Sequence, residues 1–216
     1  MTARLDHITV VAPNLEVGSA WVETALGTAP GPGRSHPGMG THNLLLALGP
    51  NVYLEVISPD PSAAPAGRPR WFGLDHVLPG SQPRLAAWVA STDDIESAAV
   101  PELGDVETMR RDVHTWQMAV KADGSVPLDG AGPLLIQRTP GSNPVAAMPQ
   151  HGLLLQRLRI WHPDPAKVLA LFARIGLAAQ PEITVTPGRE CSLVAEIQTP
   201  SGLRVLGDEP SLVTSR

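Results

Sequence analysis

The 216-residue sequence is poor in cysteine and in long apolar runs. Its single cysteine, Cys191, can form neither an internal disulfide nor a thiolate metal cluster, which is typical of a protein in a reducing compartment. No apolar run approaches the roughly 20 residues that span a bilayer, and the first residues, MTARLDHITVV, lack the features of a signal peptide. We therefore expect a cytoplasmic protein with no membrane partner.

Positive charge is also scarce, with 16 Lys and Arg against 21 Asp and Glu and a formal net charge of -5. The basic residues are scattered, so the sequence offers no basic stripe for phosphates, and we expect no nucleic-acid partner. The chain also lacks a nucleophile elbow, a phosphate-binding loop and a dinucleotide fingerprint. The glycines of GPGRSHPG have none of the spacings that these motifs need.

Hydrophobic residues make up 43% of the chain and charged residues 17%, which indicates a globular fold. In the first segment, LDHITVVAP has the pattern of a strand. A helix follows it, with Asn14 as its N-cap and Gly27 at its end. THNLLLALG and VYLEVIS, separated by Pro50 and Asn51, are typical of a β-hairpin. This segment therefore predicts a strand, a helix and then further strands.

The same plan occurs three times along the chain. The expected helix caps Asn14, Asp94 and Asp164 recur at similar intervals, which indicates an internal repeat of a β-α-β-β-β module. The three expected modules cover residues 1–60, 84–140 and 150–207.

One such module leaves one face of its short sheet uncovered, so we expect the first two modules to pair around that face. The predicted fold is α+β, with a curled mixed sheet that forms a concave cup and with helices outside. The third module is left over. It docks on the other two within the chain, or it pairs with its copy in another chain to form a homodimer.

The stretches LDHITVVAPNLEVGSAWVETALG, YLEVISP and GRSHPGMGTHN resemble the vicinal oxygen chelate superfamily and its glyoxalase-like branch. Members include glyoxalase I, extradiol dioxygenases, methylmalonyl-CoA epimerase and the fosfomycin-resistance and bleomycin-resistance proteins. The resemblance covers nearly the whole chain and weakens beyond residue 150. It implies paired β-α-β-β-β modules and, in the enzymes, a divalent metal held by residues on the first and last strands.

Carried over by position, the resemblance implies that His7 and Glu55 are metal ligands and that Gln137 is a weak third ligand. Such donors suit Fe, Mn, Zn, Ni or Co. The ligand set is incomplete, because Ala87 stands where a fourth ligand is expected, so the metal is absent in the alternative interpretation. His7 and Gln137 then make ordinary buried hydrogen bonds, whereas a carboxylate such as Glu55 is costly to bury without a partner.

Polar residues gather in HPGMGTHN, which we place at the rim of the cup. His36, Thr41, His42 and Asn43 supply hydrogen-bonding groups for a polar substrate, and Arg34 supplies charge for a carboxylate or phosphate. On a strand, neighbouring side chains point to opposite faces, so His42 and Asn43 cannot both face the cup. We favour Asn43, which also matches the family motif. Alternatively, these groups satisfy only the backbone of the loop.

Two classes of function remain open. In the first, a small-molecule enzyme of lyase, isomerase or dioxygenase type polarises neighbouring substrate oxygens with a divalent metal, while Glu55 or a histidine such as His7 moves protons. In the second, the cup is a metal-free module that binds or sequesters a small molecule, as the bleomycin-resistance relatives do. In both, Trp71 and Phe72 of a proline-rich connector are the aromatic pair most favoured to contact the ligand.

Overall fold

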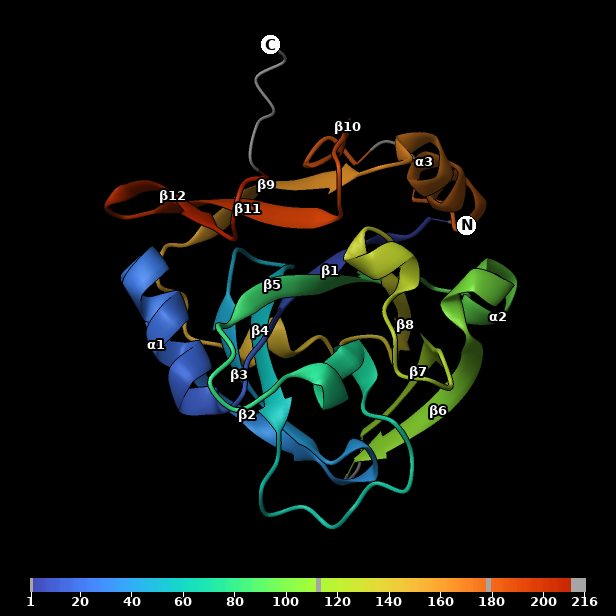
Figure 1. The fold of residues 1–216 in the computed structure, drawn as a ribbon, viewed down its shortest axis with the longest axis horizontal. Coiled ribbons are helices and arrows are strands. Elements are labelled where there is room, and N and C mark those ends of the chain that lie inside the picture. Colours follow the sequence, from blue (N-terminus) through green and yellow to red (C-terminus); the bar gives the residue numbers. More distant parts are fainter. Residues whose placement is uncertain (1, 112–113, 178–179, 211–216) are drawn as a thin grey trace.

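Figure 1 shows the chain in a computed structural model that describes residues 2–111, 114–177 and 180–210. An eight-stranded sheet curls around a hollow, and a separate four-stranded sheet lies against its outer side. The prediction of an α+β fold with a curled mixed sheet is therefore confirmed. Among the described helices, none is long and apolar enough to cross a membrane.

The elements follow the expected order along the chain. The first segment contains β1 (Arg4–Val11), α1 (Leu15–Leu26), β2 (Gly31–His36), β3 (Thr41–Ala47) and β4 (Tyr53–Pro59). The second contains β5 (Arg84–Ser91), α2 (Ile95–Ala98), β6 (Asp105–Arg111), β7 (His114–Val120) and β8 (Leu134–Arg138). The third contains β9 (Leu154–His162), α3 (Pro165–Arg174), β10 (Ile183–Pro187), β11 (Ser192–Thr199) and β12 (Gly202–Leu206). Short 3-10 turns connect them, including η1 (Pro37–Met39), η2 (Trp71–His76) and η4 (Pro127–Gly130).

The expected helix caps are confirmed and explain where the three helices begin. The side chain of Asn14 accepts a hydrogen bond from the backbone N–H of Val17 at 2.8 Å. Asp94 and Asp164 make the same contact at the start of α2 and α3, at 3.1 and 3.0 Å. Gly27 ends α1 with a φ of 72°, a left-handed conformation that glycine adopts without strain.

The eight-stranded sheet consists of two related halves, in the order β2-β3-β4-β1-β5-β8-β7-β6. In each half the first strand runs parallel to the last, and the halves meet where β1 and β5 pair antiparallel. The register shifts twice along this central pair, at Asp6 of β1 and at Ala86 of β5. The interval from Asp6 to Ala86 equals the interval from the cap Asn14 to the cap Asp94, so the two halves correspond at one fixed offset along the chain.

The third segment has the same order of elements along the chain but a different arrangement of strands. Its sheet has the order β10-β9-β11-β12, so its first strand lies inside the sheet and runs parallel to the strand that follows the helix. In the first two segments the first strand pairs instead with the last. The order of elements along the chain does not determine which strands pair. The sequence repeat alone therefore did not reveal the different strand order of the third segment.

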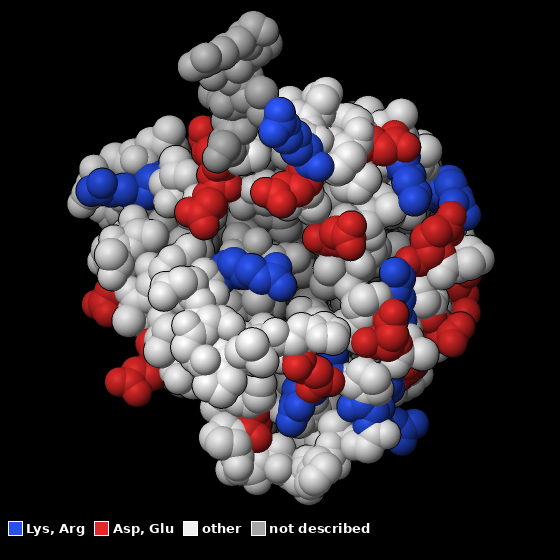
Figure 2. Space-filling view, viewed as in Figure 1, with Lys and Arg blue, Asp and Glu red and all other residues white. Residues whose placement is uncertain are grey.

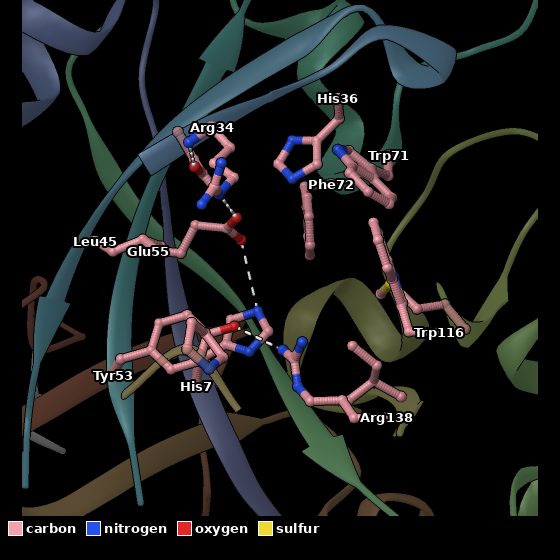
Figure 3. A pocket seen from close by; sticks show the side chains of 14 residues that line it. His7, Arg34, His36, Leu45, Tyr53, Glu55, Trp71, Phe72, Trp116 and Arg138 are labelled. Atoms are coloured by element: carbon pink, nitrogen blue, oxygen red, sulfur yellow. Dashed lines mark hydrogen bonds and ion pairs between the residues drawn. The ribbon is translucent and has the colours of Figure 1, made fainter. Parts of the chain in front are cut away.

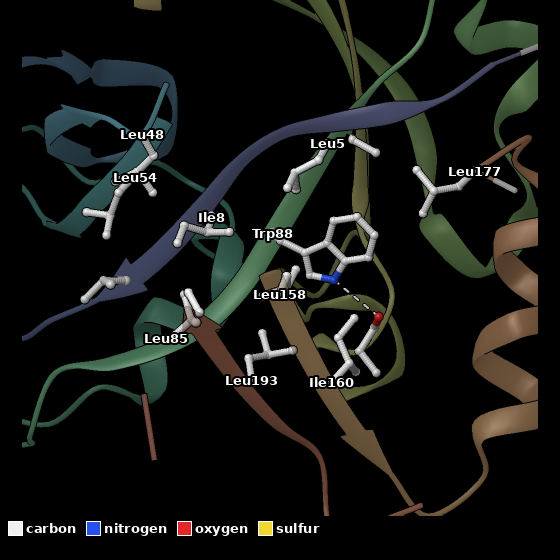
Figure 4. Close-up of a cluster of buried hydrophobic side chains, with 14 of the residues drawn as sticks. Leu5, Ile8, Leu48, Leu54, Leu85, Trp88, Leu158, Ile160, Leu177 and Leu193 are labelled. Atoms are coloured by element: carbon white, nitrogen blue, oxygen red, sulfur yellow. Dashed lines mark hydrogen bonds between the residues drawn. The ribbon is translucent and has the colours of Figure 1, made fainter. Parts of the chain in front are cut away.

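The four-stranded sheet packs against the convex face of the curled sheet. Leu158, Ile160 and Leu193 of the smaller sheet share one buried apolar cluster with Leu85 and Trp88 of β5 (Figure 4). The third segment therefore covers the outside of the cup, and the concave face keeps its own apolar cluster. A homodimer stays a prediction.

Charged side chains of both signs are interspersed on the face of the molecule that Figure 2 shows. Several form ion pairs across the surface, such as Arg68 with Glu107 and Arg159 with Glu209. On the described part of this face, the two signs therefore largely balance one another.

Candidate functional site

The concave face of the curled sheet encloses a pocket of about 110 Å³. Its lining includes six of the residues predicted from the sequence, namely His7, Arg34, His36, Asn43, Glu55 and Trp71 (Figure 3). It also includes Phe72, the other member of the aromatic pair expected to contact a ligand. The remaining lining residues were not singled out from the sequence, namely Leu45, Tyr53, Trp116, Met118, Ile136, Arg138 and Pro144. The walls are therefore largely aromatic and aliphatic, and the charged groups gather on one side of the hollow.

His7 and Glu55 meet in this pocket, although a helix and two strands separate them along the chain. The parallel register of β1 and β4 places Tyr53 beside His7 and Glu55 two positions further along. The imidazole Nε2 of His7 lies 3.5 Å from a carboxylate oxygen of Glu55. Both side chains are buried, with 5% and 7% of their surface exposed. A basic and an acidic group thus face one another at the edge of the cavity.

Asp6 fixes the other side of the His7 ring. Strict alternation along β1 predicts that Asp6 points away from His7. The bulge at Asp6 breaks this alternation, and the carboxylate lies 2.6 Å from His7 Nδ1. This contact orients the ring so that Nε2 faces Glu55 and the pocket.

Asn43 connects Glu55 to the rim of the cup. Its amide Nδ2 donates to Glu55 at 2.6 Å, while its Oδ1 accepts the backbone N–H of Arg34 at 2.7 Å. His42 is the neighbour of Asn43 on β3 and does not line the pocket among the described residues. Thr41 is buried and accepts a hydrogen bond from the indole of Trp71 at 3.2 Å. Thr41 therefore supports the rim and is not itself part of the lining.

Arg138 is a largely buried cation that lines the site. Its guanidinium donates to both carboxylate oxygens of Asp6, at 2.9 and 3.2 Å, and to the hydroxyl of Tyr53 at 2.8 Å. The Tyr53 ring stacks on the ring of His7, with 4.5 Å between their centres. A continuous network therefore runs from Arg138 through Asp6 and His7 to Glu55.

The structure does not bring Gln137 to this network. Leu134, Ile136 and Arg138 of β8 line the concave side, whereas the Gln137 side chain accepts the backbone N–H of Ile95 at the start of α2, at 2.7 Å. Leu134, and not Gln137, corresponds to Glu55, so the sequence-based register was displaced by three residues. A displacement by an odd number of residues reverses the face on which each side chain lies. Alternation along LLIQR puts Arg138 on the same face of the strand as the apolar residues Leu134 and Ile136. This pattern could have placed Arg138 in the pocket.

The rim residues lead from the pocket to a second hollow of about 280 Å³. His36, Trp71 and Trp116 line both spaces. The rings of His36 and Trp71 meet edge to face, with 5.3 Å between their centres. Phe72 beside them has a φ of 58°, a left-handed backbone conformation that is strained for a bulky residue. These rings therefore lie between the two hollows.

The network shifts the pKa values of its members. Burial by itself lowers the pKa of His7, but the contacts with Asp6 and Glu55 outweigh it and raise that pKa. Burial opposes the ionisation of Asp6, yet His7 and Arg138 hold the Asp6 pKa well below its usual range. Burial acts likewise on Glu55, whose pKa is lowered by His7 and Asn43. These shifts favour the ionised carboxylates of Asp6 and Glu55 beside Arg138 and beside the protonated form of His7.

These shifts predict a stability profile with two limbs. The lowered pKa values of Asp6 and Glu55 stabilise the fold above the unfolded values of 3.8 and 4.5, and this stabilisation is lost as the pH falls through the folded values. The raised pKa of His7 stabilises the fold fully below 6.5 and is lost as the pH rises through the folded value. We expect the melting temperature to be highest between about pH 5 and 6.5.

Calorimetry across the pH range measures this profile. His7→Gln should remove the decline on the alkaline side, while His76→Gln, at an exposed position of η2, should keep it. Identical alkaline limbs in wild type and His7→Gln would show that His7 does not cause the decline.

The donors in the pocket fit only half of a four-ligand metal site. In the first half of the sheet, Glu55 pairs with the residue two positions after His7. In the second half, Ala87 corresponds to His7 by the fixed offset between the first strands. The residue two positions after Ala87 pairs with Leu134. Ala87 and Leu134 therefore occupy the corresponding positions, and neither carries a donor atom. Among the described residues, no group of three or more His, Cys, Asp or Glu is arranged to hold a metal ion.

Comparisons with known proteins agree with this architecture. The model of the glyoxalase-like domain family matches residues 5–176. A hypothetical protein from Staphylococcus aureus has a similar fold, with a TM-score of 0.59, 15% identity and 88% of each chain covered. Methylmalonyl-CoA epimerase from Mycobacterium tuberculosis matches with a TM-score of 0.40 and 19% identity, over 67% of this chain and 91% of that one.

No curated protein matches the sequence. The family model nevertheless covers well over half of the chain, and the curled sheet of two related halves is the fold that the resemblance implied. The chain therefore belongs to the glyoxalase-like domain family.

Proposed function

We propose that this protein is an enzyme that moves a proton on a small, negatively charged carbonyl compound. The observation that carries this proposal is the position of His7 Nε2 and a Glu55 oxygen, 3.5 Å apart at the edge of the pocket. Buried titratable groups with shifted pKa values in a pocket with apolar walls are typical of active sites. The reaction type is that of an isomerase, an epimerase or a lyase.

The two groups have complementary roles. Glu55, which is held as a carboxylate, accepts the proton from the carbon next to the substrate carbonyl. His7, protonated on Nε2, donates a hydrogen bond or the proton to the oxygen on which negative charge develops. Glu55 then returns a proton to carbon while the substrate oxygen gives its proton back to His7, so the step is balanced without a further reactant. Deuterium enters the product because the proton held on Glu55 exchanges with the solvent before it returns. Asp6 keeps the ring of His7 oriented throughout.

The charges and size of the pocket define the substrate class. Arg34 lines the cavity and makes no ion pair with any described residue, so its guanidinium is available for a carboxylate. If about 10–15 Å³ holds one water-sized group, the volume of about 110 Å³ accommodates roughly ten such groups. A small oxo acid fits this space, and a longer substrate extends between Trp71 and Trp116.

A hydrogen-exchange assay tests the proposal without knowledge of the natural substrate. The protein is incubated in D₂O with a panel of 2-oxobutanoate, hydroxypyruvate and acetoacetate, and proton NMR measures the loss of the signal from the carbon next to the carbonyl. We expect saturable exchange with at least one compound. Removal of either group should slow it by at least about 100-fold, which is the lower range for general acid–base catalysis.

The test variants are His7→Gln and Glu55→Gln. Their matched controls are His76→Gln and Glu16→Gln, which change exposed residues of the same types and should exchange like wild type. Exchange that His7→Gln and Glu55→Gln leave intact contradicts the proposal.

A binding protein of the bleomycin-resistance type is the second candidate function. The apolar residues Ala87 and Leu134 favour it, because a pocket without a complete metal site is still able to hold a ligand. Saturable binding of a panel compound, measured by quenching of tryptophan fluorescence and unaccompanied by exchange, supports this alternative. The metal-dependent mechanism that the resemblance implied needs donors beyond His7 and Glu55, and no step here is assigned to a metal.

A further inference from the structure

We propose that the pocket of this chain works without a divalent cation, and that Arg138 provides the buried positive charge of the site. The inference concerns the same pocket as the proposed function, and its chemical meaning rests on that function. Its evidence is separate, because it comes from the register of the two sheet halves and from the contacts of Arg138.

The first argument is the loss of half of the donor set. The offset between the first strands relates Ala87 to His7, and the parallel strand pairing of each half then relates Leu134 to Glu55. Both replacements are buried, at 0% and 2% exposure, and both belong to the apolar cluster of the concave face. Hydrocarbon groups thus occupy the side of the cup from which further ligands would come.

The second argument is that the remaining donors already have partners. One carboxylate oxygen of Glu55 accepts from Asn43 at 2.6 Å, and the other lies 3.5 Å from His7. Asp6 cannot serve as an additional ligand, because both of its oxygens accept from Arg138 and one also contacts His7 Nδ1. A cation in the pocket would have to compete with these contacts.

The third argument is electrostatic. Arg138 is always charged at physiological pH, only 18% of its side chain is exposed, and it lines the same cavity as His7 and Glu55. Contacts with Asp6 and Tyr53 fix its guanidinium in place. A divalent cation held by Glu55 would lie near this fixed positive charge, and the resulting repulsion, which Asp6 offsets in part, opposes its binding. The same charge attracts an anionic substrate, which connects this inference to the proposed function.

Metal binding to the intact protein tests the inference directly. The full chain is stripped with a chelator and titrated with Zn²⁺, Mn²⁺ and Co²⁺ by calorimetry, and bound metal is counted by elemental analysis after dialysis. We expect wild type and His7→Ala to retain equal amounts of each metal. One equivalent of metal bound by wild type and lost in His7→Ala would overturn the proposal.

A gain-of-function variant makes the test sharper. Leu134→Glu adds a carboxylate at the position that corresponds to Glu55, with Leu134→Met as the matched apolar control. We expect Leu134→Glu to bind Zn²⁺ at least about tenfold more tightly than wild type, because it completes a set of three donors. If Leu134→Glu fails to fold by circular dichroism, the comparison of wild type with His7→Ala still decides the question.

The two proposals fail in distinguishable ways. The exchange assay is repeated on the chelator-treated protein, and exchange that persists supports metal independence. Exchange that disappears with the chelator and returns with Zn²⁺ overturns the present inference but leaves proton transfer at His7 and Glu55 intact. Metal retention itself is measured without reference to activity.

Discussion

Arg138→Met is expected to lower the free energy of unfolding by about 3–5 kcal/mol, the usual loss when one partner of a buried ion pair is removed. Methionine keeps the length and the apolar stem of the side chain but removes every donor. Asp6, of whose side chain 1% is exposed, then loses two hydrogen bonds and its cationic partner. Tyr53 also loses the donor to its hydroxyl. Urea denaturation at pH 7, followed by circular dichroism, measures the change.

A second variant separates the charge of Asp6 from the loss of packing. In Asp6→Asn/Arg138→Met the uncompensated buried charge is gone, so the double variant should recover part of the stability lost by the single one. Arg4→Met is the matched control, because Arg4 forms an exposed pair with Asp93 and such pairs contribute little. If Arg138→Met unfolds at the same urea concentration as Arg4→Met, the buried network does not stabilise the fold.

The same substitution also bears on function. Arg138 does not contact His7 directly in the structure, but it holds the Asp6 carboxylate that orients the His7 ring. Arg138 lies at the end of β8, in the second half of the sheet. Through this network it connects the folding of the cup to the geometry of His7 and Glu55, which lie in the first half. Arg138 is in this sense a positioning residue as well as a charge that faces the pocket.

Much of the fold could be predicted from the sequence, because the relevant signals are local. The caps Asn14, Asp94 and Asp164 depend on hydrogen bonds to backbone groups in the next turn of chain, so residue type and position suffice to place them. The side of β3 on which Asn43 lies follows from alternation along one regular strand. The meeting of His7 and Glu55 needed more, namely the resemblance to a family in which the first and last strands are neighbours.

The remaining parts depend on contacts that alternation does not encode. Asp6 lies beside His7 because a bulge inserts one extra residue in β1, and its sequence, RLDHITV, has no glycine to mark it. Gln137 was selected because the expected alignment of β8 with β4 was displaced by an odd number of residues, which exchanged the concave face for the convex one. The strand order of the third segment depends on how a sheet docks, which is a property of the whole fold.

Trp88→Ala is expected to lower the free energy of unfolding by about 3–5 kcal/mol, as large-to-small changes in a core do. Trp88 lies on the convex face of β5, where the third segment docks, and none of its surface is exposed (Figure 4). Its indole N–H donates to the carbonyl of Ala131 at 3.3 Å, and its ring meets the edge of Phe172. Alanine at this position leaves a cavity between the two sheets and a carbonyl without its donor.

Trp116→Ala provides the comparison, because Trp116 is a partly exposed residue of the pocket wall. Urea denaturation should show a smaller loss for Trp116→Ala, since its removal opens the pocket without separating the sheets. Limited proteolysis should cleave Trp88→Ala, but not Trp116→Ala, faster than wild type within β9 to β12. Equal losses of stability and equal proteolysis in the two variants would mean that docking of the third segment does not depend on Trp88. Packing on the convex face would then contribute little to stability, and the stability of the cup would come from its own sheet.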